Sequence, residues 1–147
     1  MKFNTPTTTA LYSIEEAIKT YRKFCQKNIS NIIKDITVDQ TLILIIIDKN
    51  PEYTQMEIAE LVFKDYASIT RIINLMISKE YLEKHINPND HRRSSIKITK
   101  KGKEAIKKLT PVIEYNRKTA LLDFDDNEIH QLYNSLQKII SNCKNQS

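Results

Sequence analysis

Residues 81–102 read YLEKHINPNDHRRSSIKITKKG, and this stretch decides the fold. Residues 81–86 and 95–99 look like strands, and the second run alternates apolar with polar side chains, as a half-buried strand does. Residues 87–93 lie between them and open with Asn-Pro-Asn-Asp, in which proline fixes φ and Asn or Asp tolerates the bend. The stretch therefore predicts a β-hairpin with a basic tip.

Helix-start signals surround this hairpin. Ser13, Thr37 and Thr54 are each followed three residues later by Glu or Gln, the pattern of a capping box, and Asp65 and Asp125 open further helices in similar style. The signals predict helices over residues 13–34, from 37 to the Asn-Pro break at 50–51, over 55–63, from 65, through 105–109 with a bend near Pro111, and from 125 onward. The β-branched run 42–47 could equally form a buried strand on propensity alone, and its capping box favours a helix.

The helix that follows Asp65 has two distinct faces. Its apolar residues recur at helical spacing and predict one buried face: Ile69, Ile72, Ile73, Met76 and Ile77. The opposite face is polar and carries no acidic residue: Ser68, Thr70, Arg71, Asn74 and Ser78. We expect this second face to be exposed.

The net charge of +5 sits in one segment. Residues 82–103 hold seven basic side chains and two acidic ones, and the segments on either side are neutral. Such a run is often only a solvated surface. A concentrated basic stripe is also the electrostatic signature of a nucleic-acid binder.

The composition excludes several classes of function. A single glycine, Gly102, cannot supply a phosphate-binding loop, and Cys25, Cys143 and the three histidines form no cluster with metal-ligand spacing. The N-terminus lacks the apolar core of a signal peptide, and the longest apolar run, 42–47, is far too short to cross a bilayer. We expect one cytoplasmic domain with no cofactor, no membrane partner and no enzymatic activity.

Four short motifs resemble those of the MarR family of transcriptional regulators. Residues 36–40 are similar to its L-T-x-x-Q, residues 65–71 to its D-x-S-x-V-T-R, and residues 90–92 and 98–102 to its wing signature D-x-R…L-T-x-x-G. The resemblance implies a mainly α fold with a small β-hairpin wing, in which residues 1–147 form a single MarR-type domain. Residues 36–109 would be the winged helix-turn-helix, flanked by dimerisation helices in residues 1–35 and 110–147.

Three positions depart from the family pattern. Phe63 and Glu80 stand where the family often has glycine, which permits φ > 0 and leaves the form of the two turns open. Thr41 stands where an aromatic residue is common.

The resemblance implies a homodimer that binds a pseudo-palindromic DNA operator and acts as a ligand-responsive repressor. Ser68, Thr70 and Asn74 could contact base edges or phosphates, and Arg71 offers a planar fork to guanine or phosphate. Tyr66 lies at the helix N-terminus, whose free N–H groups can bind phosphate. The full set of expected DNA-binding residues is Thr54, Gln55, Tyr66, Ser68, Thr70, Arg71, Asn74, Asp90, Arg92, Arg93 and Lys97.

Several of these roles have a plainer alternative. Arg92 would enter the minor groove, oriented by Asp90, or would merely solubilise a turn. Thr54 and Gln55 could donate to phosphate or only cap their helix. A winged-helix module that binds protein and not DNA is the competing function.

The resemblance further implies a small aromatic or lipophilic effector, for which the sequence alone names no pocket residues. Some relatives sense oxidants through a cysteine near the start of the first helix. Cys25 lies further along that helix on its apolar side, which favours a buried, inert thiol, and Cys143 is expected to be exposed.

Overall fold

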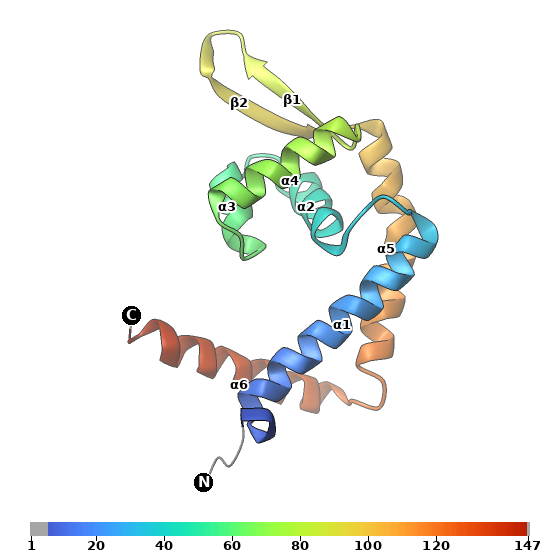
Figure 1. The fold of residues 1–147 in the computed structure, drawn as a ribbon, viewed down its shortest axis with the longest axis vertical. Coiled ribbons are helices and arrows are strands. Elements are labelled where there is room, and N and C mark those ends of the chain that lie inside the picture. The colour runs from blue at the N-terminus through green and yellow to red at the C-terminus, as the bar shows by residue number, and fades with distance from the viewer. Residues whose placement is uncertain (1–5, 147) are drawn as a thin grey trace.

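The computed structural model describes residues 6–146, and within β2 it leaves out the side chains of residues 91–94. A short 3₁₀ turn, η1 (Pro6–Thr8), precedes the long helix α1, which runs from the end of the molecule that holds α6 to the end that holds α2 to α4 (Figure 1). Helix α5 lies beside α1. The bounds are α1 (Ala10–Ile32), α2 (Val38–Lys49), α3 (Gln55–Leu61), α4 (Tyr66–Ser78), β1 (Leu82–Asn87), β2 (Asp90–Ile98), α5 (Lys100–Ala120) and α6 (Asp126–Lys144). Helices α2 to α4 and the hairpin form one body, and α6 lies at the opposite end of α1 and α5, where it runs across the bottom of the view (Figure 1). The predicted fold class, mainly α with a hairpin wing, is confirmed.

The core lies where α2, α3 and α4 meet the base of the hairpin. Its largest fully buried apolar side chains are Ile36, Ile43, Leu44, Ile58, Ile69, Ile73, Met76, Leu82 and Leu109. In α2 the buried Ile43, Leu44 and Ile47 recur at helical spacing, whereas Leu42 faces outward. The β-branched run 42–47 is therefore a helix, because packing along one face outweighs its strand propensity.

Four of the five predicted helix starts are confirmed. Thr37, Thr54 and Asp125 each accept a hydrogen bond from the backbone N–H three residues on, and their own backbone N–H donates to the side chain of that residue. Asp65 caps α4 by accepting from the Ser68 N–H. The capping box predicted at Ser13 is wrong. Helix α1 begins at Ala10, one turn earlier, because the Thr9 hydroxyl accepts from the Tyr12 N–H and caps it first.

The turns after α3 and α4 both contain a residue in the left-handed region. Phe63 has φ 60° and Glu80 has φ 67°. After each one, the next N–H reaches back five residues, from Lys64 to the Ala59 carbonyl (2.9 Å) and from Tyr81 to the Met76 carbonyl (3.0 Å). These are Schellman turns, so the left-handed geometry is present although neither residue is glycine. Because Phe63 belongs to the turn, α3 ends at Leu61 rather than at the predicted residue 63.

The hairpin is longer than predicted and its tip is shorter. Strands β1 and β2 pair antiparallel from Leu82 opposite Ile98 to Ile86 opposite Ser94. The next pair is Asn87 with Asp90. Between these two pairs β2 has three unpaired residues, 91–93, and β1 has none. The predicted basic tip is therefore wrong: the turn itself is Asn-Pro-Asn-Asp, and residues 91–93 belong to a bulged strand.

Helix α5 continues through Pro111, the residue near which a bend was predicted. It packs along α1, where the buried Asn116 accepts a hydrogen bond from the side-chain amide of Asn28 (2.8 Å). Helix α6 differs from the other long helices because none of its residues is buried. None of the helices in the described part of the chain is long and apolar enough to span a membrane.

Candidate functional site

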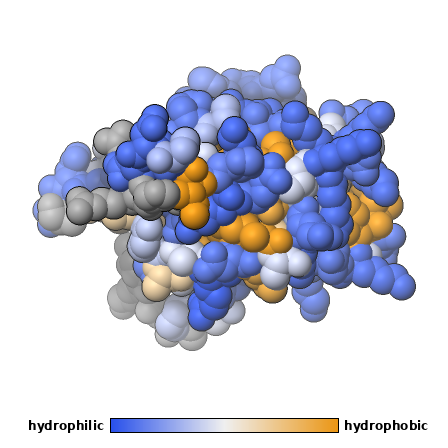
Figure 2. Space-filling view, turned by 90° about the horizontal axis from the view of Figure 1, so that it is seen from above, coloured by the Kyte–Doolittle hydropathy of each residue, from blue (hydrophilic) through white to orange (hydrophobic). Residues whose placement is uncertain are grey.

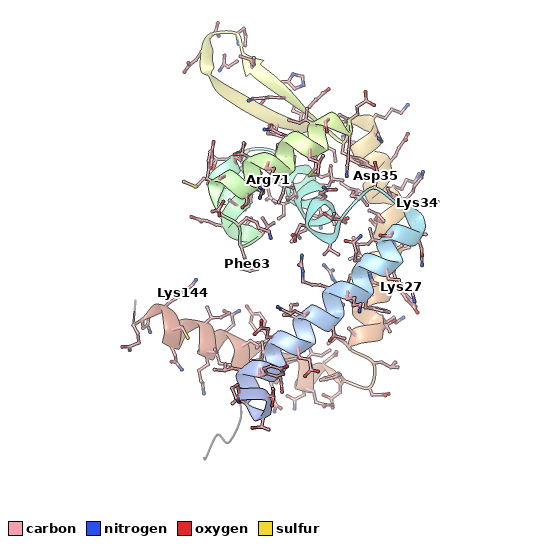
Figure 3. The ribbon with its side chains drawn as sticks, in the orientation of Figure 1. Lys27, Lys34, Asp35, Phe63, Arg71 and Lys144 are labelled. Carbon is pink, nitrogen blue, oxygen red and sulfur yellow. The ribbon has the colours of Figure 1, made fainter. Side chains whose placement is uncertain are left out.

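Helix α4 presents its polar face on the side of the molecule away from the core. Ile69, Ile73 and Met76 are buried, whereas Arg71 and Asn74 are exposed and Tyr66 is more than half exposed. Ser68 and Thr70 are half-buried. Figure 3 shows Arg71 on this helix and Phe63 at the turn that precedes it. The predicted division of α4 into a core face and an outer face is confirmed.

The start of α4 is fixed by its cap. The Asp65 carboxylate accepts a hydrogen bond from the Ser68 backbone N–H (2.7 Å). This backbone hydrogen bond holds the pKa of Asp65 below its usual value, with smaller contributions from the Ser68 side chain and from Arg71. Asp65 therefore stays ionised and caps the helix throughout the neutral range.

A side-chain link joins the starts of α3 and α4. The Thr70 hydroxyl donates to the Tyr66 carbonyl (2.8 Å), and its oxygen accepts from the side-chain amide of Gln55. A hydroxyl has one hydrogen, so the Gln55 amide must be the donor in this contact. The Gln55 carbonyl oxygen takes no part in this contact. Beside it, the Thr54 hydroxyl accepts from the Glu57 N–H as the α3 cap (3.2 Å).

The hairpin is held to the end of α4 by a compact lock around Tyr81. The Thr99 hydroxyl lies 2.6 Å from the Glu80 carbonyl and 3.0 Å from that of Tyr81, and it accepts from the Gly102 N–H as the cap of α5. The ammonium of Lys101 stands 4.5 Å from the centre of the Tyr81 ring. The lock fixes the direction in which the hairpin leaves the helical body.

The opposite side of Tyr81 is tied to the loop between α1 and α2. Its hydroxyl donates to the Asp35 carboxylate (2.7 Å), and the Lys79 ammonium donates to the Asp35 carbonyl. Burial, followed by the hydrogen bond and the negative charge of Asp35, raises the pKa of Tyr81 to about 12.

The predicted hairpin residues are only partly described. Lys97 is exposed on β2, and Asp90 is half-buried where that strand begins. Arg92 and Arg93 lie in β2, and their side chains fall outside the described part of the chain. Seen from the hairpin end, the visible surface is mostly hydrophilic, with separate hydrophobic groups between the polar side chains (Figure 2).

A cavity of about 220 Å³ lies where α1, α2 and α5 meet. Its wall is mainly apolar, with Arg22 and Arg117 as its charged members and Asn116 and Thr41 as polar ones. The remaining lining residues are Ile18, Tyr21, Cys25, Ile29, Val38, Leu42, Ile45 and Ile113. Thr41, which stands where the family often has an aromatic residue, thus borders the cavity, and its hydroxyl donates to the Thr37 carbonyl (2.9 Å).

The two cysteines lie as predicted. Cys25 is 7% exposed and Cys143 is exposed. Beside Cys25, burial raises the pKa of the Tyr21 hydroxyl, and contact with Cys25 adds to the effect. Among the described side chains, which are those of residues 6–90 and 95–146, no group of His, Cys, Asp and Glu is arranged to hold a metal ion.

Sequence reasoning did not find the Gln55–Thr70 link, the lock around Tyr81 or the two cavity arginines. Each of these features brings together residues that are 15 or more apart in the chain. No periodic sequence pattern relates such residues to one another. The nearest sequence signal was the threonine and glycine of residues 99–102, whose spacing reflects a cap and a close backbone approach.

Comparisons with known proteins agree with this architecture. The model of the MarR family matches residues 34–93. The HTH-type transcriptional regulator BilQ of Clostridioides difficile (strain CD3) is 26% identical, over 87% of this chain and 85% of BilQ. The uncharacterized HTH-type transcriptional regulator YhbI of Bacillus subtilis (strain 168) is 27% identical, over 94% of this chain and 95% of YhbI.

Solved structures share the fold. A mutant MarR from E. coli complexed with operator DNA has a TM-score of 0.78 at 22% identity, covering 87% of this chain and 91% of that chain. Bordetella bronchiseptica BpsR, described with regulation of its DNA binding by 6-hydroxynicotinic acid, has a TM-score of 0.82 at 14% identity, covering 94% and 97%. The match to the MarR family model thus covers the winged-helix part of the chain, and the solved structures show that the whole fold is that of MarR-type winged-helix proteins.

Proposed function

We propose that this chain is a transcriptional regulator that binds a pseudo-palindromic operator in double-stranded DNA as a homodimer and is released by a small effector. Residues 36–109 form the DNA-binding winged helix, and residues 1–35 and 110–147 supply the dimerisation helices. Such a protein acts as a repressor when its operator overlaps a promoter.

One observation carries the DNA-binding part of the proposal. The outward face of α4 and the hairpin are fixed to one another through Tyr81, and residues 82–103, which comprise the hairpin and the first turn of α5, hold the whole positive excess of the chain. A helix of this kind enters the major groove while the wing lies along the backbone or the minor groove. Arg71 and Asn74 would then face base edges, and Lys97 would face phosphate.

Exposed apolar surface at the far end supports the homodimer. Helix α6 has no buried residue. Three of its apolar side chains lie along one side and are each more than two-fifths exposed: Leu132, Tyr133 and Ile140. A second hollow, of about 530 Å³, lies between α1 and the end of α5 and is lined in part by small residues such as Ala17 and Ala120. A two-fold copy of the chain would cover both surfaces, because an isologous interface pairs a patch with itself.

The cavity beside α1, α2 and α5 supports the effector. Its apolar wall suits a small ring, and the guanidinium groups of Arg22 and Arg117 suit a carboxylate. A small aromatic acid combines both features. It would weaken DNA binding to the extent that it prefers the conformation that does not fit the operator.

Selection of bound fragments from a random pool of duplex DNA tests the proposal most directly. A homodimer should enrich sites with two-fold symmetry and half-sites about one helical turn apart. Failure to retain any duplex at low salt, together with capture of a protein partner, would favour the protein-binding alternative.

Salt titration then tests the wing. For wild type, log K should fall with log salt with a slope of about −0.9 per phosphate contacted, and Arg92→Ala should make the slope shallower by about that amount. Lys138→Ala, which removes an exposed cation from α6, is the matched control and should leave the slope unchanged. Asn74→Ala should instead change which bases are preferred, and a uniform loss across all sequences would refute its role in base recognition.

A further inference from the structure

One carboxylate in the structure is shared by cations from two other segments. Asp39, in the first turn of α2, has its Oδ1 atom 2.5 Å from a guanidinium nitrogen of Arg22 in α1. Its Oδ2 atom lies 3.5 Å from the ammonium of Lys64, in the turn between α3 and α4. The Asp39 side chain is 22% exposed, so the carboxylate is more enclosed than either of its partners.

At one end of this network, Arg22 also lines the cavity between α1, α2 and α5. None of the residues that line the cavity is acidic, so Asp39 supplies the carboxylate to Arg22 from outside it. A guanidinium favours paired, in-plane contact with one carboxylate. An organic anion entering the cavity would therefore compete with Asp39 for Arg22.

At the other end, Lys64 is tied to the start of α4. Its backbone N–H donates to the Ala59 carbonyl, and the residue after it, Asp65, is the cap of α4. Ser68 and Thr70 lie in the first turns beyond that cap. A change in the position of Lys64 is thus a change at the end of α4 that carries several of the proposed DNA contacts.

We propose that Asp39 is the positioning residue that couples the cavity to α4. An aromatic monocarboxylate bound by Arg22 withdraws that arginine from Asp39, and the carboxylate then turns toward Lys64 and shifts the α3–α4 turn. This inference rests on the proposed function, since it assumes that the cavity takes an anion. Because both ion pairs of Asp39 are partly exposed, we expect the coupling to change the affinity for the anion by about two- to fivefold and no more.

The test compares wild type with Asp39→Asn. Asparagine has the size of aspartate and keeps a side-chain oxygen that can accept a hydrogen bond in the first turn of α2, but it carries no charge. Benzoate is the probe, added at constant ionic strength, with its binding followed by calorimetry and DNA binding followed by anisotropy on a selected duplex. Asp39→Asn should bind benzoate about two- to fivefold more tightly, because Arg22 has no competing carboxylate. The same variant should show a smaller loss of DNA affinity on benzoate addition than wild type.

Tighter benzoate binding together with a smaller effect of benzoate on DNA affinity distinguishes coupling from a purely structural role of Asp39. A carboxylate that only stabilised the fold would leave benzoate affinity unchanged or lower it. Glu15→Gln, which removes a carboxylate from the exposed pair with Lys19 on α1, is the matched control and should respond to benzoate as wild type does. Asp39→Glu should restore part of the response.

Amide hydrogen exchange over residues 64–70 provides a readout that needs no DNA. Benzoate should change the exchange of this segment in wild type and should change it less in Asp39→Asn. If duplex binding is absent but this difference is seen, the coupling stands and the proposed function fails. If wild type does not bind benzoate, or if both proteins respond equally, the coupling through Asp39 is refuted.

Discussion

The carbonyl oxygen of Tyr81 lies where a side chain on Gly102 would have to stand. A Cβ atom at residue 102 would be 2.4 Å from that oxygen and 2.6 Å from Cγ1 of Ile98. The first turn of α5 therefore rests directly on the backbone at the base of the hairpin. The only glycine in the chain is needed for this close approach and not for a positive φ.

Gly102→Ala should destabilise the protein by about 1–2 kcal/mol, because the helix must move off the Tyr81 carbonyl and the better helix propensity of alanine offsets only part of that cost. Urea unfolding followed by circular dichroism measures the change. Lys103→Ala, at the next and exposed position, should be nearly neutral. Equal stability of Gly102→Ala and wild type would mean that Tyr81 and Ile98 can move to make room for the added methyl group without loss of stability.

Phe63→Gly should stabilise the protein by about 0.5–1 kcal/mol. Phe63 has φ 60°, a conformation that is strained for a residue with a side chain, and it is 93% exposed, so its removal sacrifices little packing. Phe63→Ala is the control, because it removes the ring and keeps the strain. A gain in the midpoint of thermal unfolding is expected for glycine alone, and an equal gain for alanine would assign the effect to the ring.

These turns show how far the sequence carries the fold. The helix caps at Thr37, Thr54 and Asp65 were predictable because each depends on residues within one turn. The left-handed turn at Phe63 was not, because the residue type argues against φ > 0 and only the packing of α3 against α4 requires it. Local signals therefore located the helix starts, whereas the form of the turn that ends α3 did not follow from residue type.

The site divides in the same way. The exposed face of α4 followed from the spacing of its apolar residues. By contrast, the sequence places Thr70 on that face as a free hydroxyl, whereas the structure uses both its donor and its acceptor within the protein. Contacts such as Asp39 with Lys64 depend on how three helices cross, which residue types alone do not determine.

Tyr81 should make the stability of the protein fall at high pH. Its pKa is raised to about 12 in the folded state from 10.0, so folding favours the protonated phenol. The corresponding stabilisation is complete below pH 10 and is lost as the pH rises through about 12. Tyr81→Phe should lose about 1 kcal/mol at neutral pH, through the hydrogen bond to Asp35, and should show a weaker decline between pH 10 and 12.

Unfolding of both proteins by urea at several pH values gives this comparison. Tyr53→Phe, at an exposed position in the loop between α2 and α3, is the matched control and should follow the wild-type curve. Parallel curves for wild type and Tyr81→Phe would contradict the assignment of the high-pH decline to this phenol.

The Gln55–Thr70 link should behave as one unit in DNA binding. Gln55→Ala removes the amide, and Thr70→Val removes the hydroxyl that orients it, so each should weaken binding to a selected duplex by about fivefold, the equivalent of about 1 kcal/mol. Since the second change removes a contact that the first has already abolished, the double variant should lose little more than the weaker-binding single variant. Lys97→Ala on the hairpin shares no partner with Thr70, and its effect should add to that of Thr70→Val. Additive losses for Gln55→Ala and Thr70→Val would show that the two side chains act independently, and the hydrogen bond between them would then have no part in placing Gln55 against DNA.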